Sequence, residues 1–178
     1  SRDVALGPNG AVHGSRMAVY VETSTLGSAA VRDIAQGIST DRIRFLDAPI
    51  SGGPPGARNG TLSILVSGSI EAFEQARATM EQVAANIFYL GENAGTSQIV
   101  KLINNHVSAA GRLAVLEGLA MGTKAGIDPK ILNDVLNASS GQNYTTTYKV
   151  PAAILTGTYK FNGPLAIGMK DHALLLEE

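Results

Sequence analysis

Cysteine is absent from the 178 residues of this sequence. Its absence excludes disulfide bridges, thiolate metal sites and cysteine nucleophiles. The three histidines, His13, His106 and His172, lie far apart, and no H-E-x-x-H or similar spacing occurs. Metal sites in proteins are usually built from clustered histidines, cysteines and carboxylates. We therefore expect no metal site.

An excess of charge is also lacking. Lys and Arg number 14 against 15 Asp and Glu, the net charge is −1, and the pI is about 6.3. The cations are scattered, so neither nucleic acid nor an anionic membrane surface is predicted as a partner. No apolar run approaches the roughly 20 residues of a membrane span, and no secretory signal is visible. The sequence predicts a cytoplasmic protein.

The first half of the sequence alternates between strands and helices. Short β-rich apolar runs predict strands, and amphipathic stretches between them predict helices. This alternation favours a parallel or mixed sheet with helices on its faces. Ser51–Gly60 holds four glycines and two prolines, and we expect neither helix nor central strand there. The predicted strands cover 17–22, 43–50, 61–67 and 86–90, and the predicted helices cover 28–36 and 70–84.

After residue 91 no strand signal returns, and the rest of the sequence is predicted to be helical. Asn93–Ile127 lacks proline and carries two adjacent apolar rows at helical spacing, which predict one helix about 45 Å long and buried over most of its circumference. Further helices are expected over 128–137, 148–155 and 165–178. We therefore predict an α/β domain over 1–91 and a helical domain over 92–178.

One cation stands near the start of this long apolar helix. Lys101 is followed four residues later by Asn105, and residues four apart share a helix face. Burial disfavours the charged form of a lysine and lowers its pKa, which suits proton transfer near neutral pH. The alternative is a structural lysine that extends its amine into water.

A glycine pair follows the second predicted strand. Ser51, Gly52 and Gly53 offer two unobstructed backbone N–H groups beside a hydroxyl, a combination suited to a carboxylate. Open α/β sheets bind ligands at the carboxyl ends of their strands, where this loop is expected. The alternative is an ordinary tight turn. Neither G-x-G-x-x-G nor a Walker sequence is present, so the sequence contains no complete phosphate cradle.

Three separate blocks carry a family resemblance. They are D-A-P-I-S-G-G-P-P-G-A-R-N-G-T-L from Asp47, G-E-N-A-G-T-S-Q-I-V-K-L-I-N-N from Gly91, and M-K-D at Met169–Asp171. In this order they resemble the β-hydroxyacid dehydrogenase family, which includes 3-hydroxyisobutyrate dehydrogenase and tartronate semialdehyde reductase. Thr23–Gly27 also resembles the family's S-T-x-x-P segment, with glycine in place of the usual proline.

The resemblance implies a role for each matching residue. Lys101 corresponds to the catalytic proton donor or acceptor of the family, and Asn105 to its hydrogen-bonding partner for the substrate. Ser51, Gly52 and Gly53 correspond to the loop that binds the substrate carboxylate. Two further positions, Thr25 and Lys170, correspond to contacts with the nicotinamide cofactor.

The resemblance also implies the fold, the cofactor and the reaction. It implies the C-terminal part of a Rossmann-like sheet joined by a long helix to a helical domain, with NAD or NADP as cofactor. The expected reaction interconverts a short 3-hydroxy acid and its semialdehyde. The glycine fingerprint that opens family members is absent, so we expect a piece of a longer protein, and a targeting segment outside it stays open.

Two alternatives accompany this interpretation. The chain is then either an inactive remnant or oligomerisation domain of the same family, with the apolar helix pairing with a second copy, or an imine or β-keto acid reductase. The related imine reductases usually lack the lysine found here at Lys101, which favours alcohol or aldehyde chemistry. A homo-oligomer is expected from the long apolar helix.

Overall fold

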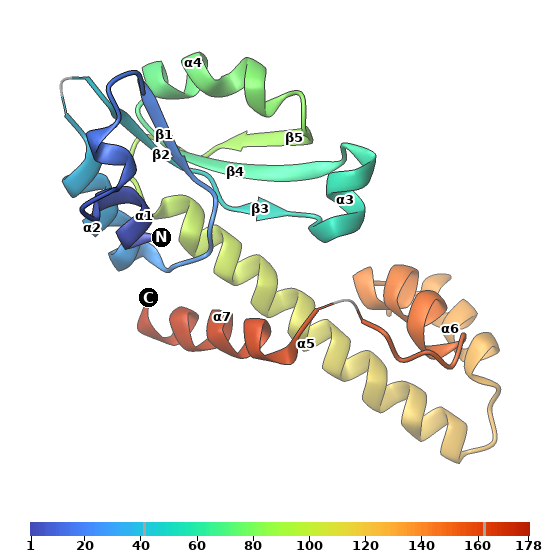
Figure 1. The fold of residues 1–178 in the computed structure, drawn as a ribbon. Coiled ribbons are helices and arrows are strands. Elements are labelled where there is room, and N and C mark those ends of the chain that lie inside the picture. Colours follow the sequence, from blue (N-terminus) through green and yellow to red (C-terminus); the bar gives the residue numbers. More distant parts are fainter. Residues whose placement is uncertain (41, 162) are drawn as a thin grey trace. The chain divides into compact units, whose positions relative to one another are not determined.

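A five-stranded mixed sheet organises the first part of the chain (Figure 1). The computed structural model describes residues 1–40, 42–161 and 163–178. Parallel pairs join β1 to β2 and β4 to β5, whereas β2 and β3 both run antiparallel to β4. The predicted mixed α/β architecture is thus confirmed. The strands are β1 (Val19–Glu22), β2 (Arg44–Asp47), β3 (Ile50–Ser51), β4 (Leu62–Gly68) and β5 (Ala84–Tyr89).

The short strands β2 and β3 follow one line along β4. Asp47 lies opposite Ser67 and Ser51 opposite Ser63, so both strands keep the same antiparallel register. Between them the N–H of Leu65 donates to the carbonyl of Pro49 at 3.1 Å. Proline has no N–H to return to the ladder, and this divides the strand predicted over 43–50 into two.

Helices cover both faces of the sheet, as Figure 1 shows. Neighbouring residues of a strand point to opposite faces. On β2, Leu46 therefore joins a core with Phe73 of α4, whereas Phe45 joins a second core with Ile34 of α2 and Ala5 of α1. The helical segments of this part are α1 (Arg2–Leu6), the 3₁₀ turn η1 (Ala11–His13), α2 (Ser28–Ile38), α3 (Gly53–Asn59) and α4 (Ile70–Met80).

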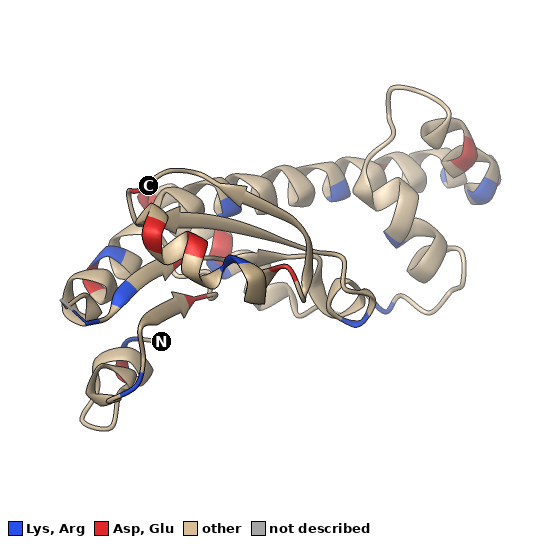
Figure 2. Cartoon of the chain, turned by 90° about the horizontal axis from the view of Figure 1, so that it is seen from above, with Lys and Arg blue, Asp and Glu red and all other residues tan. Residues whose placement is uncertain are grey.

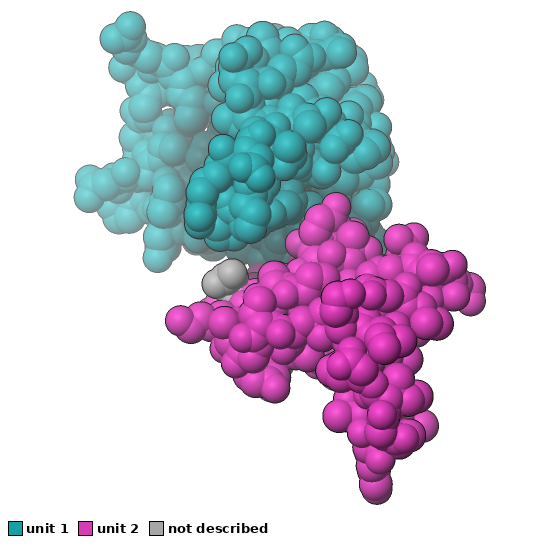
Figure 3. Space-filling view, turned by 90° about the vertical axis from the view of Figure 1, so that its right-hand side faces the viewer, with its two compact units in different colours: residues 1–103, 173–178 teal, residues 104–172 magenta. Residues whose placement is uncertain are grey.

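The chain forms two units (Figure 3). The first comprises Ser1–Ile103 with Ala173–Glu178, and the second Asn104–His172. The second unit has its own core, in which Val115 and Leu119 of α5 pack with Val150. The sequence predicts a domain boundary at residue 91 from composition. That boundary stays a prediction, because the two units are defined by which residues pack together and not by composition. The remaining helical segments are α5 (Thr96–Lys124), α6 (Pro129–Asn137), the π-helix η2 (Thr145–Ile154) and α7 (Leu165–Glu177).

The expectation that Ser51–Gly60 contains no helix is wrong. Gly53–Asn59 forms α3, with Pro54 and Pro55 in its first turn. The N–H groups of a first turn have no partner within the helix, so proline loses nothing there. Gly60 ends the helix in the left-handed conformation at φ +65°, and its N–H donates to Gly56 O.

The predicted burial of the long helix is only partly correct. α5 buries Leu102, Ala109, Val115 and Leu119, which are at most 8% exposed. Other apolar residues of α5 stay exposed, because the elements packed against α5 in this chain cover only part of its circumference. These residues are Val100, Ile103, Val107, Leu113 and Met121, with exposed fractions between 36% and 73%.

Charged residues occur throughout the chain. Acidic and basic residues are interspersed along the elements (Figure 2). Among the described residues, no helix combines the length and apolar character needed to cross a bilayer.

Gly68, at the end of β4, requires glycine for two reasons. Its φ is +137°, and a Cβ there would lie 2.6 Å from the carbonyl oxygen of Phe45. We expect Gly68→Ala to lower the free energy of unfolding by about 2–3 kcal/mol, because both backbone strain and a clash are added. Urea denaturation measures this change.

The matched control is Gly118→Ala within α5. A Cβ at Gly118 has no atom within 4 Å, and alanine favours the helix over glycine by about 1 kcal/mol. Equal stability changes for the two substitutions would contradict the strain assigned to Gly68.

Candidate functional site

The buried carboxylate of Asp47 connects three elements at the end of β2. Asp47 is fully buried. Its Oδ1 accepts from Gln98 Nε2 at 2.6 Å, and its Oδ2 accepts from Ser97 Oγ at 2.7 Å, Gly95 N at 3.1 Å and Ser67 Oγ at 3.3 Å. These donors come from β4, from the start of α5 and from the residue just before it. The network fixes the first turn of α5 at the carboxyl end of β2.

Burial and hydrogen bonding act in opposite directions on this carboxyl group. Burial raises the pKa of Asp47, because the charged form loses its hydration. The hydrogen bonds from Gln98, Ser97, Gly95 and Ser67 lower the pKa and only partly offset that effect. The net result is a pKa above the ordinary value of an aspartate.

Gln98 extends this network to the segment that follows β1. Its Oε1 accepts from the backbone N–H of Leu26 at 2.8 Å and of Gly27 at 3.2 Å. Its Nε2 donates to Ser24 O at 3.0 Å in addition to Asp47. The segment Ser24–Gly27, which contains Thr25, is thereby held to the start of α5.

Lys101 follows one helical turn later. It lies four residues after Ser97 and three after Gln98, so helical periodicity puts it on the same face of α5. The residue is buried, with an exposed fraction of 7%.

The Ser51–Gly53 loop lies beyond the carboxyl end of β2. Ser51 continues the line of β2 four residues after Asp47. Gly52 and Gly53 have φ values of +120° and +58°, a region that side chains rarely adopt. Consecutive N–H groups in such a conformation form a small anion-binding concavity. Ser51 is half-buried and both glycines are exposed.

A second carboxylate holds the other end of the Thr25 segment. Glu178 accepts from the backbone N–H of Ser28 through Oε1 and from the Ser28 hydroxyl through Oε2, both at 2.6 Å. Ser28 is the first residue of α2, where backbone N–H groups lack helical partners. Thr25 itself is half-buried between Ser24 and Leu26.

Within the second unit, Asn105 is joined to Asp171. The amide Nδ2 of Asn105 donates to Asp171 Oδ2 at 2.7 Å. The other oxygen, Asp171 Oδ1, is ion-paired with Lys170 Nζ at 2.9 Å. Asp171 is 5% exposed, so this carboxylate is buried between two residues that the sequence assigns to the site. His106 packs edge to face against His172 with ring centroids 5.2 Å apart.

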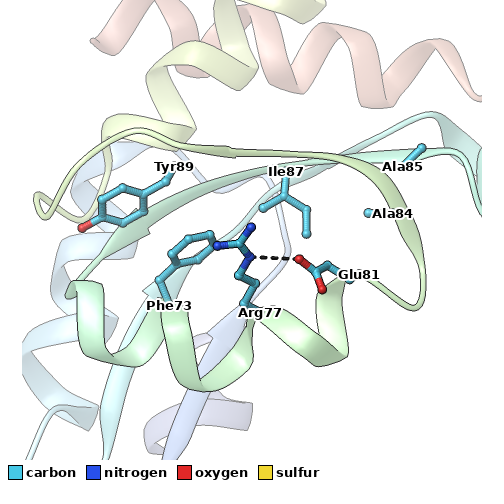
Figure 4. A pocket seen from close by; sticks show the side chains of 7 residues that line it. All are labelled: Phe73, Arg77, Glu81, Ala84, Ala85, Ile87 and Tyr89. Carbon is cyan, nitrogen blue, oxygen red and sulfur yellow. Dashed lines mark hydrogen bonds and ion pairs between the residues drawn. The ribbon is translucent and has the colours of Figure 1, made fainter.

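A pocket of about 340 Å³ on α4 and β5 contains none of the predicted site residues. Its walls include Phe73, Tyr89 and Arg77 (Figure 4). The guanidinium of Arg77 bonds Glu81 at 2.9 Å and lies 5.9 Å from the centre of the Phe73 ring. No cluster of three or more potential metal ligands occurs in the described part of the chain.

Sequence reasoning missed several of the residues that organise the site. Gln98, Ser97 and Glu178 were not singled out, and Asp171 was not linked to Asn105. A signal was available for two of them, because Ser97 and Gln98 are polar residues on the Lys101 face of an otherwise apolar helix. Asp47, which opens the first of the three family blocks, accepts four hydrogen bonds from these surroundings.

The substitution Asp47→Asn tests the network. An amide nitrogen would face either Gln98 Nε2 or the Gly95 N–H, both of which are donors, so we expect a loss of about 2–3 kcal/mol in the free energy of unfolding at neutral pH. The raised pKa means that the folded state binds a proton more tightly than the unfolded state. The stability due to Asp47 is therefore fully present at low pH and falls as pH rises through the raised pKa.

Urea denaturation of both proteins from acidic to neutral pH measures this behaviour. The stability difference between wild type and Asp47→Asn should shrink as the pH rises. The control is Asp33→Asn, which removes an exposed ion pair with Arg2 and should change little. An Asp47→Asn variant as stable as this control would contradict the assigned role.

Comparisons with known proteins agree with this architecture. A family model for the NAD binding domain of 6-phosphogluconate dehydrogenase matches residues 1–91. A second, described as NAD-binding of NADP-dependent 3-hydroxyisobutyrate dehydrogenase, matches residues 95–178. Because both models describe NAD-binding domains, the predicted cofactor class, NAD or NADP, is confirmed for the family.

Curated relatives and solved structures point the same way. The 3-hydroxyisobutyrate dehydrogenase of Pseudomonas aeruginosa is 39% identical over 126 residues, 71% of this chain and 42% of that protein. The 2-(hydroxymethyl)glutarate dehydrogenase of Eubacterium barkeri is 28% identical over 172 residues, 96% of this chain and 57% of that protein. A crystal structure of 3-hydroxyisobutyrate dehydrogenase from Salmonella typhimurium matches with a TM-score of 0.87 and 26% identity, covering 99% of this chain and 61% of the other.

The chain spans about half the length of the curated relatives it matches. The family models together cover nearly all of its residues, and its fold is that of the Salmonella enzyme. The chain therefore belongs to the β-hydroxyacid dehydrogenase family.

Proposed function

We propose that the protein is an NAD(P)-dependent dehydrogenase that interconverts a short 3-hydroxy acid and its semialdehyde. The observation that carries the proposal is the burial of Lys101 one turn after Ser97 and Gln98, the residues that anchor α5 to Asp47 at the carboxyl end of β2. Ligands of open α/β sheets bind at that end. A buried amine there is suited to proton transfer rather than to solvation.

Lys101 is the proton acceptor in the oxidation of the alcohol and the proton donor in the reverse direction. Its amine takes the hydroxyl proton as the carbon–oxygen double bond forms, which is general base catalysis. Packing of Leu102 and the hydrogen bonds of Ser97 hold the helix that carries the amine. Orientation by a rigid element contributes to the rate because the reacting groups are held in position before reaction.

The Ser51–Gly53 loop binds the substrate carboxylate. Its support is the positive φ of Gly52 and Gly53 next to Ser51, since consecutive backbone N–H groups in such turns can form an anion-binding concavity. Hydrogen bonds from neutral donors to a carboxylate are charge-assisted and strong. This loop accounts for the preference for an acid over a simple alcohol.

Asn105 holds the substrate oxygen. Its Nδ2 carries two hydrogens, and the bond to Asp171 uses one of them. The second is directed by the same contact, since the amide plane is fixed once Asp171 is bound. Asp171 thereby orients Asn105 and, through its other oxygen, Lys170, the predicted cofactor contact.

The described residues fit the nicotinamide end of NAD or NADP. The half-buried Thr25 lies on the segment after parallel strand β1, where such cofactors bind. We assign Thr25 and Lys170 to holding the cofactor, and the sequence printed here contains no glycine-rich phosphate cradle. When bound, the nicotinamide accepts the hydride from the carbon that bears the hydroxyl.

The relatives support the substrate class. Both 3-hydroxyisobutyrate and 2-(hydroxymethyl)glutarate, named in the activities of the relatives, carry a hydroxymethyl group on the carbon next to a carboxylate. A carboxylate loop and a base for a nearby hydroxyl match this arrangement. The predicted cytoplasmic location and homo-oligomeric state stay predictions.

A second candidate function is oligomerisation without catalysis. The exposed apolar residues of α5, which include Val107, Leu113 and Met121, favour it because exposed apolar surface commonly marks interfaces. Titration with NADH, followed by fluorescence, separates the two functions. Saturable binding supports the dehydrogenase, and absence of binding supports the oligomerisation domain. An imine or β-keto acid reductase is distinguished from the dehydrogenase by a substrate panel.

Substitution of the proposed base is the direct test of the mechanism. Lys101→Met should lower kcat by about 10³-fold, the range found for loss of a general base, with NADH affinity changed by less than about twofold. Lys124→Met, at the exposed end of the same helix, is the matched control and should retain full activity. Substantial residual turnover by the Lys101 variant would refute its role.

The carboxylate loop makes a separate prediction. Ser51→Ala should raise the KM for the hydroxy acid by about tenfold, because one hydrogen bond to a charged group is lost, while the Kd for NADH stays constant. Ser39→Ala, at the exposed end of α2, serves as the control. Steady-state kinetics with hydroxy acid and cofactor varied separately measures both quantities. A rise in the Kd for NADH instead would assign Ser51 to the cofactor.

A further inference from the structure

The side-chain amide of Gln98 uses every hydrogen bond that it can form. An amide side chain has two donor hydrogens and an oxygen that accepts two bonds. Gln98 donates to Asp47 Oδ1 and Ser24 O, and it accepts from the N–H groups of Leu26 and Gly27. The residue is fully buried. A buried amide with this many partners specifies one geometry for whatever it bonds.

Asp47 determines which way the Gln98 amide points. An ionised carboxylate only accepts hydrogen bonds, so the NH₂ group of Gln98 must face it at 2.6 Å. The oxygen of the amide is then directed at Leu26 and Gly27. Asp47 is itself held by Ser97 and Ser67. Orientation thus passes from the sheet to Asp47, to Gln98 and then to the Ser24–Gly27 segment.

The backbone of the Ser24–Gly27 segment forms hydrogen bonds with the Gln98 side chain, as the backbone of a strand does with a neighbouring strand. It follows β1 and precedes α2, and it belongs to neither element. Loop backbone normally bonds to water and is mobile. Here three of its backbone groups, Ser24 O, Leu26 N and Gly27 N, bond a single side chain on both sides of Thr25. The position of Thr25 therefore depends on Gln98.

The same residue is three positions before Lys101 on α5. Any displacement of Gln98 within its network would move the Thr25 segment relative to the helix turn that carries the amine. Both of these belong to the first unit, as do the four hydrogen-bond partners of Gln98 described above. The positions of Thr25, the proposed cofactor contact, and of Lys101, the proposed proton-transfer group, thus both depend on the Gln98 side chain.

We propose that Gln98 is a positioning residue for the nicotinamide cofactor, fixing the Thr25 segment with respect to Lys101. This inference rests on the proposed function. Gln98 itself is fully buried. It acts through the backbone of Ser24, Leu26 and Gly27, so its loss weakens cofactor binding beyond any loss of stability.

The first test replaces Gln98 with methionine, which has a similar length and no hydrogen-bonding amide. In the intact protein Gln98→Met should raise the Kd for NADH by about tenfold or more, since the contact segment is released. The matched control is Asn133→Leu, which removes another buried amide whose Nδ2 donates to Thr146 O in the second unit. It should lower the Tm with little change in the Kd for NADH.

The second test, Gln98→Glu, uses pH as the readout. The new carboxyl group can still accept from Leu26 and Gly27, but its other oxygen faces two acceptors, Asp47 Oδ1 and Ser24 O. A shared proton can join it to Asp47, whereas the bond to Ser24 O is lost at every pH. Sharing raises the pKa of the pair, so the proton is held at low pH and lost as pH rises. Another carboxylate, that of Glu22, contacts the same segment, because it accepts a hydrogen bond from Ser24 N.

NADH affinity of the Gln98→Glu protein should therefore be partly restored near pH 5 and fall toward pH 8, by about tenfold relative to wild type. Rescue at low pH is the expected result, and a merely structural residue would shift only the Tm.

The outcomes separate the inference from the function on which it rests. A wild-type protein that binds neither NADH nor NADPH overturns both. Wild-type binding with an unchanged Kd in Gln98→Met overturns the positioning role alone. Failure of both Gln98 variants to fold at any pH would assign the amide to folding and would also overturn the positioning role.

Discussion

Burial of the Asp47 carboxylate is the constraint on which the first unit depends. An ion removed from water without partners costs several kcal/mol, so the surrounding chain must supply donors. It supplies them from β4, from Gly95 and from the first turn of α5. If these elements separated, the Asp47 carboxylate would either be exposed or stay buried without its hydrogen-bond donors. A long helix is in this way joined to a sheet at a defined point, although much of the contact is polar.

From that point the functional residues follow by the geometry of regular structure. Lys101 comes one turn along α5, and Ser51 comes four residues along the line of β2. Gln98 carries the same constraint to the Ser24–Gly27 segment. In the second unit, Asp171 performs a comparable task for Asn105 and Lys170. In both units a buried carboxylate orients residues that are assigned to ligands, and neither carboxylate is itself assigned to the chemistry.

The regular elements were predictable because their signals are local. Period-two and period-3.6 patterns located four strands and the long helix within a few residues of their ends. Pro54 and Pro55 misled the prediction for Ser51–Gly60, since proline excludes a helix interior but not its first turn. The apolar rows of α5 predicted more burial than the chain provides, because periodicity identifies an apolar face without identifying what covers it.

For the candidate site too, some residues could be predicted from the sequence and others could not. The roles of Lys101, Asn105 and Ser51–Gly53 came from a family pattern and stay predictions, whereas the residues that hold them required the structure. Gln98 bonds residues more than 70 positions away, and Asn105 bonds a residue 66 positions away. A single glutamine or aspartate in a helix has no periodicity to mark it. Only the three-dimensional contacts distinguish such a residue from one facing water.

Amide hydrogen exchange at Leu26, Gly27 and Gly95 tests the central claim most directly. These N–H groups lie outside helices and strands, yet the Asp47–Gln98 network predicts that they exchange only through large-scale unfolding of the first unit. Their protection should match that of the β4 amides paired within the sheet. Exchange at the rate of an exposed loop would show that the network does not hold the Thr25 segment or the start of α5, and the account would fail.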